Sequence, residues 1–217
     1  MSDILREVDD IMKAERMNRL WQDHGKTILM MIGAIILGTA LNSAWTSWKT
    51  HQAEAQTTAI IDAMKSDAPV KNLKELTATL KGSGRAFAAL DSATLSLEKG
   101  QFADAIAFYT LIKDDKSAPQ DLRDLAVVQL VAIQIDHADD VTADTLLQEL
   151  SPVLNSKDSV WRLRALLNSA VIKAHKNKDF KGALEDLALL SVEPGLPPSM
   201  SAQISALQDV YQHRMEK

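Results

Sequence analysis

The sequence predicts an all-α protein in which a single N-terminal transmembrane helix precedes a solenoid of stacked helical pairs. Three observations support this prediction. Residues 27–48 contain no charged side chain, the few glycines and prolines fall mostly between stretches with helical apolar spacing, and one pattern of a helical pair occurs twice. Ala and Leu dominate the chain and aromatic residues make up only 5% of it, a composition that favours helices over strands.

The uncharged run from Thr27 to Trp48 is long enough to cross a bilayer. As a helix it would extend about 33 Å, and the hydrocarbon core of a bilayer is about 30 Å thick. A cleaved signal peptide is one alternative, but the preceding arm carries six acidic residues and the run is too long for such a signal. A buried core helix, the other alternative, would rarely stay uncharged over this length. We therefore expect an uncleaved anchor.

The number of positive charges near each end of this run predicts which end faces the cytoplasm. Four Lys or Arg residues lie among residues 7–26, and two lie among residues 49–68. Because Lys and Arg favour the cytoplasmic side of a membrane, we expect a cytoplasmic N-terminus and a large domain on the opposite side.

Two pairs of small residues in the run have a spacing that lets transmembrane helices approach closely. These are Ala34 with Gly38, and Ala40 with Ala44. The spacing indicates a contact with a partner helix in the membrane. The alternative is chance, because such pairs are frequent in any span that is rich in Ala and Gly.

The N-terminal arm, residues 1–26, has apolar positions at helical spacing with acidic residues opposite them. The apolar positions are Ile4, Leu5, Val8, Ile11 and Met12. This pattern predicts an amphipathic helix that lies on the membrane surface or against a cytosolic protein. The alternative is a short solvated helix that only sets topology. The acidic residues argue against binding to anionic lipid.

Beyond the span, we divide the chain into connecting helices at 49–84 and a helical repeat domain at 85–217. No glycine or proline interrupts residues 45–68, so the transmembrane helix is expected to continue to about Met64. Gly82-Ser83-Gly84 is expected to be a turn. The helices expected in the repeat domain are 85–99, 102–113, 119–136, 142–154, 159–176, 180–190 and 197–214.

Two of these helical pairs share a sequence pattern. Phe102 and Phe180 each begin a second helix, and each is followed three positions later by an alanine, Ala105 or Ala183, and then by large apolar residues at helical spacing. The small alanine lets the second helix pack closely on the first. Since no pair buries its own apolar face, the pairs must stack into a solenoid. The alternative is an Ala- and Leu-rich bundle with chance similarity.

The pattern resembles a divergent tetratricopeptide repeat array, although the usual period is nearer 34 residues. The whole chain is similar to the YfgM-like tetratricopeptide repeat family, the ancillary SecYEG translocon subunits, in its alphaproteobacterial form. The opening Met1–Asp10, then Arg19-Leu20-Trp21 and His24-Gly25, then one span and degenerate repeats, are the features that resemble this family. The N-terminal arm is longer and more regular than in the commonest form.

This resemblance implies a single-pass protein of the bacterial inner membrane with a cytoplasmic N-terminus and a periplasmic repeat domain. The implied partners are a SecYEG-type translocon, a PpiD-type periplasmic chaperone and exported polypeptides. The implied role is to assist newly exported proteins by binding. The alternatives are a structural repeat scaffold in cell-envelope assembly or division, and a regulator of a cytosolic client, which would require the opposite topology.

Nothing in the sequence indicates catalysis, and no cofactor or metal is predicted. The five His residues lack metal-ligand spacing, there is no Cys, and no nucleophile-elbow, Walker or dinucleotide-binding motif is present. Asp114-Asp115 and Asp139-Asp140 lie at expected helix ends, where solvated turn residues are common. A net charge of −5 without a basic stripe argues against nucleic-acid binding.

If the repeats bind a peptide, the first helix of each pair is expected to line the concave surface. The family pattern projects onto positions in the first helices of two pairs. These positions are Leu90, Thr94, Leu97, Asn168, Ile172, His175 and Lys176. For each of them, a core or solvated role is the alternative interpretation.

Overall fold

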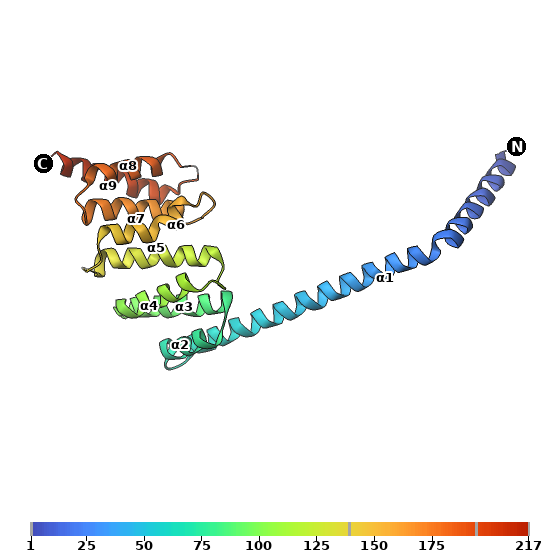
Figure 1. Ribbon diagram of the computed structural model, residues 1–217, viewed down its shortest axis with the longest axis horizontal. Coiled ribbons are helices and arrows are strands. Elements are labelled where there is room, and N and C mark those ends of the chain that lie inside the picture. The colour runs from blue at the N-terminus through green and yellow to red at the C-terminus, as the bar shows by residue number, and fades with distance from the viewer. Residues whose placement is uncertain (1, 139, 194, 217) are drawn as a thin grey trace. The chain divides into compact units, whose positions relative to one another are not determined.

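The computed structural model describes residues 2–138, 140–193 and 195–216, without the side chains of residues 2–25, 27–29, 32 and 33. The described residues form nine α-helices and no strand (Figure 1). They are α1 (Ser2–Lys65), α2 (Pro69–Thr79), α3 (Gly82–Glu98), α4 (Phe102–Asp114), α5 (Gln120–His137), α6 (Ala143–Asn155), α7 (Arg162–His175), α8 (Phe180–Ser191) and α9 (Pro198–Met215).

The chain forms two compact units, Met1–Ala55 and Gln56–Lys217. The described part of the first unit belongs to α1, which continues into the second unit and ends at Lys65. The expectation that the helix runs on past Trp48 is therefore confirmed. The apolar face expected for the N-terminal arm lies outside the described side chains.

Within the described residues, no helix has a stretch that is both long enough and apolar enough to cross a membrane. The span expected at residues 27–48 includes positions 27–29, 32 and 33, whose side chains lie outside the described part of the chain. The span therefore stays a prediction, as do the expected boundaries between the four parts of the chain.

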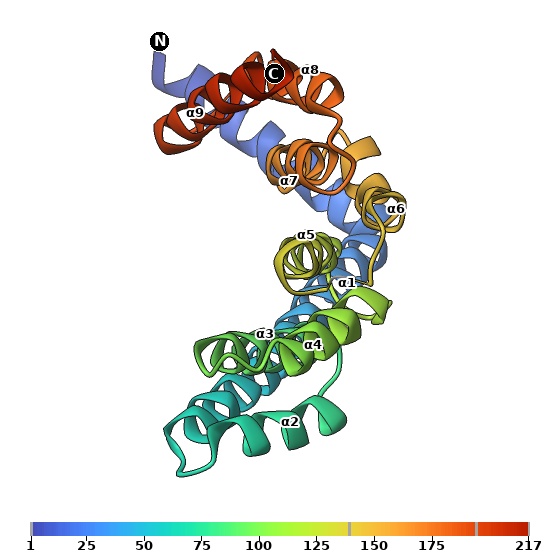
Figure 2. The same cartoon turned by 90° about the vertical axis from the view of Figure 1, so that its left-hand side faces the viewer.

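The second unit is a stack of helical pairs. Each helix from α2 to α9 packs on the next, and α5 also packs directly on α7. Figure 2 shows the first helices α3, α5 and α7, together with α9, on one side of the stack and the second helices α4, α6 and α8 on the other. This arrangement confirms the predicted all-α fold with stacked pairs.

The apolar core of the stack is continuous from one pair to the next. Leu130 of α5 is buried against α3 and α4, whereas Val131, its neighbour in sequence, is buried against α6 and α7. In the same way Ile172 of α7 faces α5 and α6, and Ala170 faces α8 and α9. Each first helix thus completes two cores, which is why no pair would be stable alone.

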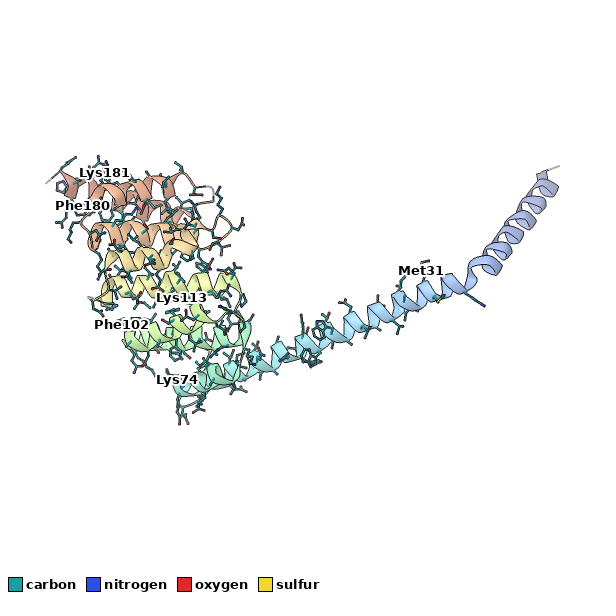
Figure 3. The ribbon with its side chains drawn as sticks, viewed as in Figure 1. Met31, Lys74, Phe102, Lys113, Phe180 and Lys181 are labelled. Atoms are coloured by element: carbon teal, nitrogen blue, oxygen red, sulfur yellow. The ribbon has the colours of Figure 1, made fainter. Side chains whose placement is uncertain are left out.

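The shared Phe-Ala pattern has the structural role expected for it. Ala105 and Ala183 are fully buried at the places where α4 and α8 meet their neighbours. Phe102 stacks on His137 at the end of α5, with ring centroids 3.5 Å apart. Phe102 and Phe180 lie along one edge of the second unit (Figure 3).

Most expected helices agree with the structure to within one residue, but two starts differ. The turn expected at Gly82-Ser83-Gly84 is the first turn of α3. Gly82 has a φ of +59°, which favours glycine, and Gly84 is buried where an added Cβ would collide with the Gln56 side chain of α1. Gly84 thus allows a close approach to α1, Gly82 supplies the positive φ where α3 begins beside Ser117, and neither glycine ends a helix. The helix α3 therefore begins three residues earlier than expected, at Gly82.

The start of α3 is tied to the turn between α4 and α5. The Gly82 N–H donates to Ser117 Oγ at 3.0 Å, and the Ser117 hydroxyl and N–H both donate to Asp115 Oδ1. Arg85 of α3 lies 3.5 Å from the other Asp115 oxygen. The hydrogen bond from the Ser117 hydroxyl is the main reason why the pKa of Asp115 is lowered, and the positive charge of Arg85 contributes less.

The second difference is at α7, which begins at Arg162 and not at residue 159 as expected. Ser156 and Ser159 form successive turns before the helix, with Ser159 N–H donating to Ser156 O and Arg162 N–H donating to Ser159 O. This turn leaves Val160 and Trp161 outside the helix. Their placement matters for the candidate site.

Candidate functional site

A hollow of about 330 Å³ opens on the side of the second unit formed by the first helices. We call it the first-helix hollow. Its walls come from α5, from the start of α7 and from the start of α9. The lining residues are Leu125, Val128, Gln129, Val160, Trp161, Leu163, Arg164, Pro197 and Met200.

The lining of the first-helix hollow is mostly apolar. Only Gln129 and Arg164 bring polar side chains, and Arg164 makes no ion pair among the described residues. Val160 is 70% exposed at the rim, although it is a large apolar side chain in an ordered turn. A concave apolar surface with a few polar groups is typical of a site that takes apolar side chains of a ligand.

The turn that carries Val160 and Trp161 is held by a buried carboxylate. Asp124 of α5 is almost fully buried and accepts hydrogen bonds from Ser159 Oγ and from Gln120 Nε2, both at 2.6 Å. The Trp161 N–H in turn donates to Ser159 Oγ at 3.4 Å. The rim of the hollow is thus positioned by contacts between α5 and the turn, and it is not a loose loop.

Polar contacts between adjacent pairs also hold α7 against its neighbours. Arg162 pairs with Glu193 and donates from Nε to Leu154 O at 3.3 Å. Asn168 is buried and donates from Nδ2 to Val128 O at 2.9 Å. The Asn168 bond joins the first helices α7 and α5 directly, and the Arg162 contacts tie the start of α7 to α6 and to the turn after α8.

A second hollow, of about 460 Å³, lies where the end of α7, the start of α8 and the end of α9 meet. We call it the C-terminal hollow. His175 lies edge-on to Tyr211 with ring centroids 6.2 Å apart, and Phe180 lies 6.0 Å from the same ring. Burial raises the pKa of the Tyr211 hydroxyl.

The groove residues predicted in the first pair do not line either hollow. Leu90 and Leu97 are partly buried against the core shared by α3, α4 and α5. Thr94 is exposed, and its hydroxyl donates to Leu90 O at 3.0 Å within the helix. Thr94 alone of the three has the exposure that the groove prediction requires.

The predictions in the later pair divide into core and surface residues. Ile172 is fully buried between α5, α6 and α7, so its expected place in an open groove is wrong. Asn168 is also buried, and Lys176 donates from Nζ to Ala138 O at 3.0 Å. His175 is exposed and lines the C-terminal hollow. Of these four positions, three lie on α7 and Lys176 lies directly after it, and the family pattern did not distinguish buried positions from exposed ones.

Two residues of the first-helix hollow could have been noticed in the sequence, although a search for helical apolar spacing does not detect them. Val160 and Trp161 are a large apolar pair directly after the polar segment 156–159. Apolar residues in a turn that do not fit the period of the next helix are candidates for an exposed apolar surface.

In the first unit, the predicted packing positions Ala34, Gly38, Ala40 and Ala44 are all exposed. A Cβ added at Gly38 would meet no atom within 4 Å. The two pairs lie on different faces of α1, and contact of either face with a partner helix stays a prediction. Among the described residues there is no group of three or more His, Cys, Asp or Glu placed to hold a metal ion.

The pattern of the tetratricopeptide repeat-like domain family matches residues 18–157, which is more than half of the chain. The chain belongs to this family. The match begins within α1 and ends after α6, and α7 to α9 extend the tetratricopeptide repeat-like stack by the same packing. Such domains are typically protein-interaction modules without catalytic activity. The comparisons with curated proteins and with solved structures returned no match.

Proposed function

We propose that this tetratricopeptide repeat-like protein binds extended polypeptides through the first-helix hollow while anchored to a membrane by residues 27–48. The observation that carries the proposal is the hollow itself, an apolar concavity between α5, α7 and α9 with Val160 exposed at its rim. Its occupant would be a short apolar segment of another protein, because the lining offers apolar contact and only two polar side chains. Exported polypeptides, which are unfolded when they leave the translocon, present such segments.

Substitution of Val160 by Asp tests the hollow. The probe is a short fluorescein-labelled peptide that carries two adjacent leucines and, five residues further along, two adjacent glutamines. We expect its dissociation constant to rise about fivefold or more in V160D, because a charge would sit against the apolar ligand; fivefold corresponds to about 1 kcal/mol. Fluorescence anisotropy measures the binding.

The matched control is Val192→Asp. Val192 is another valine outside a helix, 79% exposed, and it does not line the hollow. Both substitutions replace an exposed valine by the same charge, so neither is expected to unfold the protein. Binding that is equal in V160D and wild type, or equally weakened in V160D and V192D, would contradict the proposed site.

The membrane anchor rests on the uncharged run and on the side chains it exposes. Ile35, Ile36, Leu37 and Leu41 are all exposed on α1, and no described residue covers them. A helix with apolar side chains all round is typical of a membrane span. The excess of Lys and Arg before the run supports a cytoplasmic N-terminus and a second unit on the other side of the membrane, which the family resemblance implies is the periplasm.

The double substitution Ile36→Arg with Leu37→Arg tests the anchor. Each Arg near the centre of a span costs about 3 kcal/mol on insertion scales, so we expect the variant to leave the membrane pellet after carbonate washing. Leu189→Arg, at an exposed leucine of the second unit, serves as control and is expected to stay in the pellet. A double variant that pellets like wild type would contradict the anchor.

The partners proposed for the anchored protein are a SecYEG-type translocon and a PpiD-type periplasmic chaperone, and this part rests on the family resemblance. An anchor beside the translocon would raise the effective concentration of the repeats near emerging chains. Site-specific crosslinking from Val160 in cells is the direct experiment. Crosslinks to exported chains and translocon subunits are expected. Crosslinks confined to one envelope or division complex would favour the scaffold alternative.

A further inference from the structure

We infer that the C-terminal hollow binds acidic side chains of an extended polypeptide. The hollow combines two cationic side chains and a histidine with an apolar wall. Lys178 comes from the turn after α7, His175 from the end of α7 and Arg214 from the end of α9. Phe180, Val210 and Tyr211 form the apolar wall.

The cationic groups of this hollow are not neutralised by the protein itself. Within the described residues neither Lys178 nor Arg214 makes an ion pair, whereas nearby Lys173 is 2.8 Å from Asp186 and is occupied. Two acidic residues, Asp179 and Glu216, lie within two positions of Lys178 and Arg214 in the sequence. Asp179 accepts from the Gly182 N–H at 2.9 Å as the cap of α8, and Glu216 is exposed and makes no ion pair with any described residue.

The local charge is opposite to that of the whole chain. The net charge of the chain is −5, but the segment from Lys173 to Lys181 contains four Lys, His175 and a single acid. A cationic cluster in an acidic protein favours association with anionic groups and disfavours contact with the protein's own surface. The expected ligand is therefore acidic.

The apolar wall indicates which acidic ligand fits. The hollow has a volume of about 460 Å³, more than a bare carboxylate fills, and Val210 is half exposed along it. A Glu or Asp side chain in a polypeptide would place its methylene groups and neighbouring side chains against Phe180 and Tyr211, with the carboxylate toward Lys178 and Arg214. Partial exclusion of water at an apolar wall strengthens such charge pairs.

Lys178 is held in place by the way α7 ends. It adopts a φ of +57°, the left-handed conformation of a helix-ending turn, and the next residue, Asp179, donates its N–H to Lys173 O at 2.9 Å. A non-glycine residue in this conformation is mildly strained. Glycine would suit the backbone better, so the position offers a substitution that removes the charge without threatening the fold.

The two hollows are spaced so that one peptide can reach both. Arg164 at the first-helix hollow and His175 at the C-terminal hollow are three turns apart on the same side of α7, a distance of about 16 Å at ~1.5 Å per residue. An extended chain covers that distance in about five residues at ~3.3 Å each. The preferred ligand would carry an apolar pair and an acidic pair separated by this interval. The spacing expected in the ligand depends on the proposed function, whereas the acidic site is inferred from the residues of the C-terminal hollow alone.

The experiment compares the dileucine–diglutamine probe described above with the same peptide carrying two glutamates in place of the glutamines. In wild type the glutamate peptide is expected to bind about tenfold or more tightly than the glutamine peptide at low salt, and to lose this advantage as salt is raised. The double variant Lys178→Gly with Arg214→Gln is expected to bind both peptides equally. Its thermal unfolding is expected to match wild type.

The matched control is Lys74→Gln with Lys157→Gln, two exposed lysines on α2 and in the turn before α7 that lower the net charge by the same amount. This control is expected to keep the preference for glutamate. A preference that persists in the Lys178 and Arg214 variant, or that disappears equally in the control, would overturn the inference.

The outcomes separate this inference from the proposed function. If the glutamine peptide binds in a Val160-dependent manner but glutamate adds nothing, the acidic site fails and the first-helix hollow stands. If glutamate binding depends on Lys178 and Arg214 but V160D has no effect, the acidic site stands and the proposed hollow fails. If wild type binds neither peptide, both are overturned.

Discussion

Replacement of Leu187 by alanine is expected to lower the free energy of unfolding of the second unit by about 2–5 kcal/mol. Leu187 lies on α8 and is 0% exposed, in the core that α8 shares with α7 and α9. The substitution removes apolar contact and leaves a cavity, since neighbours such as Leu166 and Ile204 are themselves packed against other residues. Urea unfolding followed by circular dichroism measures the loss.

Because contacts in a solenoid are between neighbours, the damage is expected to be local. Hydrogen exchange should quicken most in α8 and α9, which lie at the end of the stack, and least in α3 and α4. The matched control is Leu189→Ala. Leu189 is the same residue type two positions away on α8, 58% exposed, and its loss is expected to change stability by no more than about 0.5 kcal/mol. Equal effects at the two positions would contradict the packing of α8 described here.

Replacement of Ala105 by leucine is the second large effect expected. Ala105 is 0% exposed on α4, in the core between α3, α4 and α5. Added methyl groups would force α4 away from its neighbours, and overpacking of this kind typically costs about 1–3 kcal/mol. Chemical unfolding measures the cost. The result tests whether the alanine shared by the two matching pairs is required for close helix packing.

Ala103→Leu is the control for this substitution. Ala103 lies on the same helix but is exposed, and alanine and leucine have similar helix propensity. The free energy of unfolding of A103L is expected to stay within about 0.5 kcal/mol of wild type. If A105L were as stable as A103L, the alanine would have no packing role and the shared pattern would be coincidental.

The helices of the repeats could be predicted because the signal for them is local. Apolar spacing, the turn residues after Glu98 and the proline before Ser199 mark where helices begin and end, and most limits agree with the structure. The Phe-Ala pattern likewise predicted which positions pack closely, since a small residue at a helix contact is a sequence property. The start of α3 was predicted wrongly because glycine ends helices in some contexts and permits close approach in others.

The candidate site could be predicted only in outline. Sequence placed it on first helices, and the first-helix hollow does lie there, but none of the seven projected residues lines it. Val160 and Trp161 lie before the helix in a turn that depends on the Asp124 carboxylate of another pair. A contact between residues this far apart in the chain leaves no periodic signal in either segment.

By itself the sequence determined the all-α class, the order of the helices, the repeated pair and the uncharged run on which the membrane proposal rests. Those features follow from local spacing and composition. Only the tertiary structure decided which side chains remain exposed to solvent. Ile172 and His175 are three residues apart on α7, yet α5 and α6 cover Ile172, while α8 and α9 leave His175 at the edge of a hollow. Exposure depends on what the neighbouring pair covers, and that is settled only when the pairs stack.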